Sequence, residues 1–432
     1  MYETQTSDRA FLVGLKLPPR VGNLDVDASL DELAGLDETA GLEVVGRTYQ
    51  QVVHPDPATY IRSGKVDEVQ TWLRELEATT VIFDDELSPR HQRELEKVLG
   101  EDVRVLDRTP LILDIFAQHA HTKEGALQVE LAQYEYRLPR LTRAWTHLAR
   151  QAGGSAARGG VGLRGPGETQ LETDRREIGR RISHLKGELE KVRAHRERYR
   201  QERQRQGIPV CALVGYTNAG KSTLLNRISG STVYTADQLF ATLDPTTRRV
   251  TLPGGQTVLF TDTVGFIQKL PHNVVAAFRA TLEEVVEADL LVHVIDISHP
   301  FALEQAISVE NTLRHDLGIE QLSMVPVFNK ADRLDNTEPK GLNALIDHYP
   351  EGVLVSAVTG EGLPDLLTAI EAELMSSMVR VQVAIPYTQA DMISLFYDLA
   401  HVEDEQADAD SMHLTGLMRP RHAAIYDRFR QE

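Results

Sequence analysis

The first hundred residues alternate short apolar runs with longer polar stretches of helical periodicity. The apolar runs are Ala10–Leu17, Leu42–Tyr49, Thr80–Phe83 and Val103–Leu106, and the helical stretches are Ser29–Leu36, Lys65–Leu76 and Pro89–Val98. Short buried strands alternating with helices are typical of a mostly parallel sheet covered by helices. Residues 1–108 are therefore predicted to form a small α/β domain.

From residue 109 the pattern becomes that of long helices. Two apolar stripes have alternating spacings of four and three residues: Leu127, Leu131, Tyr134, Leu138, Leu141, Trp145 and Leu148, then Ile178, Ile182, Leu185, Leu189 and Val192. Such heptad stripes predict two helices packed antiparallel as a long hairpin over residues 109–206. Pro139 is expected to kink the first helix. Residues 153–167 between them hold seven glycines and no acidic residue, and such long irregular loops are functional or disordered.

The rest of the chain divides into two further predicted domains. Residues 207–377 contain apolar strand-like runs followed by glycine-rich or polar turns, which predicts a mostly parallel sheet with helices on both faces. Residues 378–432 predict a small α+β domain, with strands at Val379–Ile385 and Met412–Leu417 and a helix at Gln389–Ala400. Residues 402–410 are predicted to form an acidic loop.

Composition indicates the cellular compartment in which the protein is expected. The chain has no run of eighteen apolar residues, and its N-terminus lacks the basic-then-apolar pattern of a signal peptide. The single cysteine, Cys211, excludes an intrachain disulfide. We expect a cytoplasmic monomer without integral membrane association.

Charge is distributed unevenly along the chain. The net charge is −18, which by itself argues against a nucleic-acid partner, yet residues 175–205 hold twelve Lys/Arg against five Glu. We interpret this basic helix and the glycine-rich loop as an RNA-binding surface; a solvated coiled-coil face is the alternative. The candidate RNA contacts are Arg158, Arg164, Arg193, Arg196, Arg200 and Arg203, and the last four fall between the heptad positions.

A phosphate-binding loop follows the apolar run at residues 210–214. Its residues are Gly215, Tyr216, Thr217, Asn218, Ala219, Gly220, Lys221, Ser222 and Thr223, with a helix-like stretch after them. Strand, G-x-x-x-x-G-K-S loop and helix form the context in which backbone N–H groups surround phosphate oxygens. Lys221 is expected to act on the β- and γ-phosphates, and Ser222 to ligate Mg²⁺.

Three further motifs arrive in order, each after an apolar strand. Asp262, Thr263, Val264 and Gly265 form a D-x-x-G turn, in which Asp262 would hold Mg²⁺ through a water and Gly265 would face the γ-phosphate. Asn329, Lys330 and Asp332 form an N-K-x-D motif, in which Asp332 can accept from N1–H and the amine of guanine. Ser356 and Ala357 would form the turn against the base. Together these motifs predict a site for GTP.

A switch threonine is expected between the phosphate loop and Asp262. Phe240, Ala241, Thr242 and Leu243 are candidate GTP contacts, and Thr242 is our choice for a catalytic Mg²⁺ ligand, with Thr246 and Thr247 as alternatives. One departure from Ras-like enzymes follows D-x-x-G, where their water-orienting glutamine is replaced by Phe266. Intrinsic hydrolysis is therefore expected to be slow.

These residues resemble the HflX family of ribosome-associated GTPases over essentially the whole chain. The specific segments are Arg164–Arg176, the phosphate loop, Phe240–Arg248 and Asp262–Phe266. The resemblance implies Mg²⁺-dependent GTP hydrolysis stimulated by the large ribosomal subunit, with the hairpin entering ribosomal RNA and with a role in ribosome splitting or rescue. Two other functions stay open: a GTPase associated with tRNA modification, and a GTP-binding scaffold with little turnover.

Overall fold

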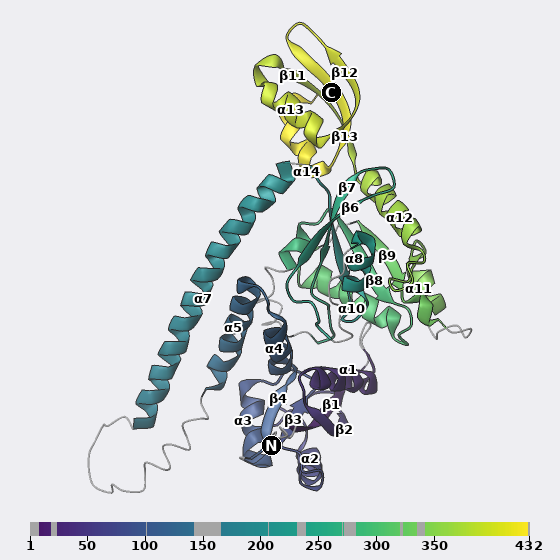
Figure 1. Cartoon of the computed structure of the whole chain (residues 1–432). Helices are drawn as coiled ribbons and strands as arrows, with labels where there is room; N and C mark the ends of the chain where they lie inside the picture. The colour runs from purple at the N-terminus through teal and green to yellow at the C-terminus, as the bar shows by residue number, and fades with distance from the viewer. Residues whose placement is uncertain are drawn as a thin grey trace, which may run out of the picture.

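The computed structural model describes residues 8–18, 24–100, 102–141, 166–205, 207–230, 239–269, 271, 282–319, 323–334 and 342–430, with the side chains of residues 166–171, 197–205, 420 and 421 left out. Three sheets follow one another along the molecule, and one long helix runs beside them (Figure 1). The fold class predicted from the sequence is confirmed. None of the described helices is long and apolar enough to cross a bilayer.

The N-terminal sheet is wholly parallel, with strand order β2-β1-β3-β4. The central strand β1 is buried almost throughout, as expected for a strand covered by helices on both faces. One face packs on helices α2 and α3, and the other on α1 and α4. The elements are β1 (Arg9–Lys16), α1 (Val26–Thr39), β2 (Glu43–Gln51), α2 (Ser63–Glu75), β3 (Thr80–Phe83), α3 (Pro89–Leu99), β4 (Arg104–Asp107) and α4 (Arg108–His119).

The predicted helical hairpin is present, with different bounds from those expected. Helix α5 (Lys123–Arg137) ends two residues before Pro139, which lies in a 3-10 turn instead of kinking a longer helix. Helix α7 (Pro166–Arg205) begins earlier than expected, so the last two residues of the predicted loop are helical. Leu185 of α7 is fully buried, and Arg181 pairs with Glu130 of α5 at 2.7 Å. Trp145, Leu148, Arg158 and Arg164 lie outside the described residues.

The central sheet has strand order β10-β9-β8-β5-β7-β6 and is parallel except for the antiparallel edge strand β6. Strand β6 was not predicted, because its sequence Thr-Thr-Arg-Arg-Val-Thr is polar. The elements are β5 (Val210–Gly215), α8 (Lys221–Ser229), β6 (Thr246–Thr251), β7 (Thr257–Asp262), β8 (Leu290–Asp296), α10 (Ala302–His315), β9 (Met324–Asn329), α11 (Leu342–His348), β10 (Val353–Leu354) and α12 (Leu363–Ser376).

The C-terminal sheet is antiparallel, in the order β11-β13-β12. The prediction of an acidic loop over residues 402–410 is wrong, since His401–Ala407 form strand β12. This strand lies at the edge of the sheet and is mostly exposed, so its carboxylates stay in water. The elements are β11 (Val379–Pro386), α13 (Ala390–Leu399), β12 (His401–Ala407) and β13 (Ser411–Met418).

The N-terminal and central sheets share one apolar core. It joins Leu30, Leu33 and Phe116 of the N-terminal helices with Phe240 and Phe266 beside the phosphate loop. The rings of Phe116 and Phe240 lie 4.6 Å apart between their centroids. This continuous core places α1 and α4 directly against the predicted switch residues.

Candidate nucleotide site

The phosphate loop joins β5 to α8 and can be built only with glycine at its two ends. Gly215 has φ +153°, and a Cβ there would lie 2.2 Å from the carbonyl oxygen of Val294. Gly220 has φ +95°, and a Cβ there would lie 2.3 Å from Nδ2 of Asn329. Helix α8 starts at Lys221, so its N-terminal N–H groups face the concave side of the loop, the geometry that binds phosphate.

Lys221 is buried at the centre of this loop. Its Nζ donates to the carbonyl oxygens of Gly215 (3.0 Å) and Tyr216 (2.8 Å). Burial lowers the pKa of Lys221 to about 8, against the opposing attraction of Asp262. A phosphate beside the ammonium group would restore the usual preference for the charged form.

The three predicted Mg²⁺ ligands meet at one point. Ser222 Oγ donates to Asp262 Oδ2 at 2.5 Å and lies 2.7 Å from Thr242 Oγ1. Burial raises the pKa of Asp262, and its Oδ1 is buried without a hydrogen-bond partner among the described residues. Hydroxyl and carboxylate oxygens are the ligands that Mg²⁺ prefers, so this set fits the ion. The alternatives Thr246 and Thr247 lie in β6, where Thr247 Oγ1 is 3.0 Å from Thr261 Oγ1.

The D-x-x-G turn rests directly on the phosphate loop. Thr217 N donates to Phe266 O at 2.7 Å, and Phe266 N donates to Gly215 O at 3.1 Å. A Cβ on Gly265 would lie 2.8 Å from the Cα of Thr217 and 3.2 Å from Nζ of Lys221, so only glycine permits this approach. The Phe266 side chain is buried in the core shared with the N-terminal sheet.

The predicted guanine-binding residues are assembled around Asn329. Its Nδ2 donates to Ala219 O at 2.8 Å, while its Oδ1 accepts from Ala357 N at 3.0 Å. Asn329 therefore holds the phosphate loop and the Ser356–Ala357 turn together. Ser356 Oγ donates to Asp332 Oδ1 at 2.5 Å, which leaves the exposed carboxylate with acceptor capacity for a base. Lys330 pairs with Asp296 at 2.7 Å.

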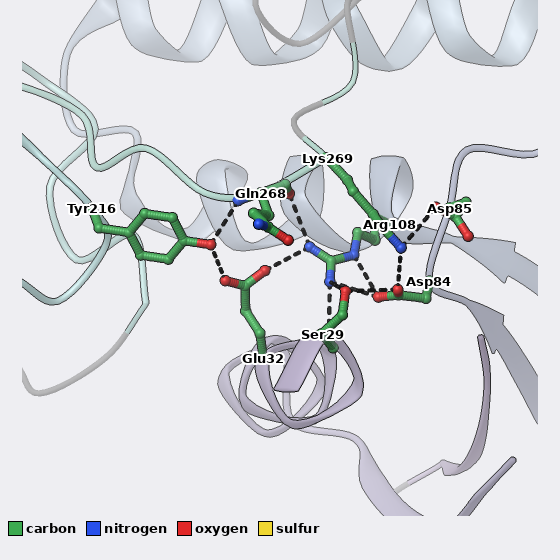
Figure 2. Close-up of polar contacts among 8 residues, drawn as sticks. All are labelled: Ser29, Glu32, Asp84, Asp85, Arg108, Tyr216, Gln268 and Lys269. Atoms are coloured by element: carbon green, nitrogen blue, oxygen red, sulfur yellow. Dashed lines mark hydrogen bonds and ion pairs between the residues drawn. The ribbon is translucent and has the colours of Figure 1, made fainter. Parts of the chain in front are cut away.

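Several predicted GTP contacts have side chains that point elsewhere. Phe240, Leu243 and Val264 are buried in the core shared with the N-terminal sheet. They could reach a nucleotide only through backbone atoms. The Tyr216 side chain also leaves the loop and turns toward α1, where its hydroxyl donates to Glu32 (Figure 2).

A buried arginine that sequence reasoning missed joins the two sheets. Arg108 is fully buried, and its Nη2 donates to Asp84 Oδ1 at 2.6 Å and its Nη1 to Glu32 Oε1 at 2.7 Å (Figure 2). The same Nη1 donates to the backbone oxygen of Gln268 at 2.9 Å. Burial raises the pKa of Asp84, but Arg108 and then Lys269 outweigh it and bring the value to about 2. Asp84 is therefore the ionised partner of the guanidinium.

This cluster lies at the carboxyl edge of the N-terminal sheet, since Asp84 and Arg108 directly follow β3 and β4. Parallel α/β sheets commonly hold ligands at that edge. Here the segment after D-x-x-G occupies it: Lys269 pairs with Asp84 and, at 2.7 Å, with Asp85. Gln268 N donates to the Tyr216 hydroxyl at 2.8 Å. Charged residues just after two parallel strands were the sequence signal for this junction.

Two arginines of the basic helix α7 pair with carboxylates elsewhere in the fold. Arg196 Nε lies 2.8 Å from a carboxylate oxygen of Glu124, a buried residue in the first turn of α5. Arg193 Nη2 lies 3.4 Å from Glu283 Oε1 near the central sheet. Both arginines therefore make contacts within the fold, although they fall between the heptad positions. The Arg200 and Arg203 side chains lie outside the described residues.

His293 in β8 gives the structure a specific sensitivity to acid. It is fully buried, both ring nitrogens lack a hydrogen-bond partner among the described residues, and burial lowers its pKa to about 3. Below its unfolded pKa of about 6.5, the unfolded chain takes up a proton that the folded chain excludes. We expect this residue to cost about 1.4 kcal/mol of unfolding free energy per pH unit as pH falls from about 6.5 to about 3.

The measurement compares urea unfolding of the wild type and His293→Phe across that pH range. The variant should lose stability less steeply, whereas His315→Phe, at an exposed histidine, should follow the wild type. Parallel curves for the wild type and His293→Phe would contradict this account.

A glycine-bounded phosphate loop, three converging oxygen ligands that fit Mg²⁺ and an N-K-x-D motif on one sheet edge define the protein as a P-loop GTPase. In the described parts of the chain, no group of three or more His, Cys, Asp or Glu side chains could hold a metal by itself. In this class, phosphate oxygens complete the coordination of Mg²⁺.

Comparisons with known proteins assign the family. Family models match in succession, described as GTP-binding GTPase N-terminal (27–117), GTP-binding GTPase Middle Region (119–203), 50S ribosome-binding GTPase (210–330) and HflX C-terminal domain (343–429). The chain is 46% identical over 397 residues to GTPase HflX of Lacrimispora saccharolytica, covering 91% of this chain and 90% of that protein. It is also 46% identical over 357 residues to GTPase HflX of Escherichia coli strain K12, covering 82% and 81%. The chain belongs to the GTPase HflX family of GTP hydrolases.

Among solved structures, the crystal structure of a GTP-binding protein from the hyperthermophilic archaeon Sulfolobus solfataricus in complex with GDP is similar to this chain. It aligns with a TM-score of 0.42 and 25% identity, over 85% of this chain and 99% of that one.

Proposed function

We propose that the protein is a Mg²⁺-dependent GTPase switch that binds the large ribosomal subunit in GTP-dependent ribosome splitting or rescue. The observation that carries the proposal is the meeting of Ser222, Thr242 and Asp262, which come from the phosphate loop, the switch I segment (residues 240–244) and the end of β7. A threonine that reaches the metal site only in one arrangement of its segment makes the GTP state distinguishable from the GDP state. A match to the family model described as 50S ribosome-binding GTPase supports the ribosomal partner.

Each part of the site has a separate role in binding or catalysis. The backbone N–H groups of the loop and Lys221 would bind the β- and γ-phosphates, and Gly265 N would face the γ-phosphate. Ser222 and Thr242 would hold Mg²⁺ directly, and Asp262 would do so through a water. An ion held there would supply positive charge to the phosphate oxygens. Asp332 would select guanine by accepting from N1–H and the exocyclic amine.

Slow turnover by the free protein is part of this proposal. Phe266 stands where a glutamine would orient the attacking water, and its side chain is buried in the shared core. Loss of one hydrogen-bond donor to the transition state typically costs about 10²–10³ in rate. The ribosome would restore turnover by ordering the switches or by supplying a group. The same residue favours the alternative of a GTP-binding scaffold with little turnover.

Helix α7 offers the surface for ribosomal RNA. Arg175, Arg176 and Arg180 are exposed on it, and Arg200 and Arg203 lie on its C-terminal part. Together with Arg158 and Arg164, these residues supply positive charge in an otherwise acidic chain, so RNA phosphates are the partner that their chemistry fits. Binding of a ribosomal subunit also places the protein in the cytoplasm.

The test is GTP hydrolysis measured with and without purified large ribosomal subunits. We expect subunits to raise turnover by about a hundredfold or more. A variant with Arg175, Arg176 and Arg180 changed to glutamine should bind subunits less tightly. The slope of log affinity against log salt concentration should become shallower by up to about one per lost phosphate contact. Lys221→Ala is the control for contaminating hydrolases.

Absence of stimulation would reject the ribosomal switch and favour the scaffold. Unchanged subunit binding by the arginine variant at every salt concentration would move the RNA contacts away from this face of α7. Sedimentation of ribosomes with the protein and a non-hydrolysable GTP analogue then reports whether subunits separate.

A further inference from the structure

We infer that Asp244 is a positioning residue for Thr242, because it anchors the switch I segment to the first turn of α5, the same turn that holds α7. The inference rests on the proposed role of Thr242 in the GTP state. It adds a set of contacts through which a change at Thr242 is transmitted to the helical hairpin.

Asp244 forms an anchor with residues 121–125, more than a hundred positions earlier in the chain. Its Oδ2 accepts from the N–H groups of His121 (2.9 Å) and Thr122 (2.8 Å), and its Oδ1 accepts from the Thr122 hydroxyl. Thr122 is the N-cap of α5, and its Oγ1 accepts from Gly125 N at 3.0 Å. A carboxylate in this place binds free N–H groups and meets the positive end of the helix.

Gly125 gives an independent sign that the anchor is built for close approach. It lies in the first turn of α5, three residues after the N-cap, and glycine is a poorer helix former than alanine. Its backbone conformation does not require glycine, but a Cβ there would lie 2.5 Å from Asp244 Oδ1. The missing side chain therefore makes room for the carboxylate.

The anchor fixes Thr242 because little of the segment between them is free. Leu243 is buried in the shared core, and Phe240 at the other end of the segment packs on Phe116 of α4. With both ends held by the N-terminal part of the chain, the Thr242 hydroxyl lies 2.7 Å from Ser222 Oγ. Loss of the anchor would free one end and let Thr242 leave the metal site.

The same turn of α5 positions the hairpin. Glu124 lies two residues after the N-cap, is buried, and pairs with Arg196 of α7 at 2.8 Å. Gln128 one turn later donates to Glu124 Oε1 at 3.2 Å. A change in the position of Thr242 is therefore transmitted to α7 through one turn of α5. The central sheet does not take part in this route.

The experiment measures the affinity of the full chain for GDP and for a non-hydrolysable GTP analogue, both with Mg²⁺. Asp244→Ala removes the anchor, and Gly125→Ala displaces the carboxylate while leaving it in the chain. We expect each to weaken analogue binding by about tenfold or more and GDP binding by no more than about twofold. Asp244→Asn keeps one acceptor oxygen and should fall in between. Asp67→Ala, at an exposed residue of α2 on the opposite face of the N-terminal sheet, should match the wild type.

A second readout follows the hairpin directly. Hydrogen exchange of the amides at residues 122–126 and around Arg196 should be slower with the analogue than with GDP in the wild type, and this difference should vanish in Asp244→Ala. Equal weakening of both nucleotides would overturn the inference, because it would show a general loss of structure. Unchanged analogue binding in Asp244→Ala would overturn it too. Failure of the wild type to bind either nucleotide would instead reject the proposed function.

Discussion

Arg108→Met is expected to lower the free energy of unfolding by about 3–5 kcal/mol. The substitution removes the cation that faces Asp84 and Glu32, which are both buried, and it leaves their carboxylates without that partner. It also removes the donor to the backbone oxygen of Gln268, so the segment after D-x-x-G loses its tie to the N-terminal sheet. Equilibrium urea unfolding of both proteins measures the effect.

Arg47→Met is the matched control. Arg47 also pairs with an aspartate, Asp31, but both side chains are largely in water, with 43% and 68% of their surfaces exposed. An exposed pair of this kind contributes about 1 kcal/mol or less. Adding Glu32→Gln to Arg108→Met should recover part of the loss, since it removes one of the uncompensated charges. A loss no larger than that of the control would mean that Lys269 and water satisfy the two carboxylates.

Asp332→Asn should weaken GTP binding by about 2–4 kcal/mol, a factor of about 30 to 1,000. The substitution replaces a carboxylate that can accept from N1–H and the exocyclic amine of guanine with an amide that also carries donors. The amide suits xanthine, whose carbonyl group replaces the guanine amine. The Ser356 hydroxyl, 2.5 Å from Asp332 Oδ1, can donate equally well to an amide oxygen, so the turn should remain in place.

Titration with labelled GDP and xanthosine diphosphate measures this change in preference. The exposed Asp365→Asn on α12 is the control and should leave both affinities unchanged. Full retention of GDP affinity by Asp332→Asn would show that residues 329–332 do not bind the base.

The parts of the site that the sequence predicted are local in the chain. Gly215, Gly220 and Ser222 belong to a single turn between a strand and a helix, so their spacing alone specifies their geometry. Asp262 and Asn329 are the last residues of the buried strands β7 and β9, and parallel strands bring their carboxyl ends to one edge. The structure accordingly gathers these residues where the pattern placed them.

Two strands escaped prediction because hydrophobic periodicity is weak at the edge of a sheet. Strand β6 contains one buried residue, Val250, and β12 is acidic and almost wholly exposed. An edge strand needs only one paired neighbour, and water satisfies its other side. The acidic composition of residues 402–410 therefore led to the prediction of a loop, although most of them lie in β12.

Contacts between distant segments were beyond the reach of the sequence pattern. Asp244 and Thr122 are separated by 122 residues, and Arg108 and Gln268 by 160. The place of Arg108 directly after a parallel strand is the one local signal. Its partners come from α1, the end of β3 and the segment after D-x-x-G, which the pattern does not bring together. The ion pair of Arg196 with Glu124 was beyond the pattern for the same reason, since Glu124 lies on another helix.

The core shared by the first two sheets changes how this protein can be dissected. A chain that began at residue 207 would keep every nucleotide motif and would still lack the surface that covers Phe240, Leu243, Val264 and Phe266. Burial of an apolar side chain of this size contributes about 1.5–3 kcal/mol to stability. The fragment would lose that contribution and would expose an apolar patch beside its phosphate loop, which favours aggregation. GTP hydrolysis by this fragment would then reflect switch segments without their packing partners, not those of the whole protein. We therefore expect the smallest fully active enzyme to include the N-terminal sheet, because the two parts share one apolar core.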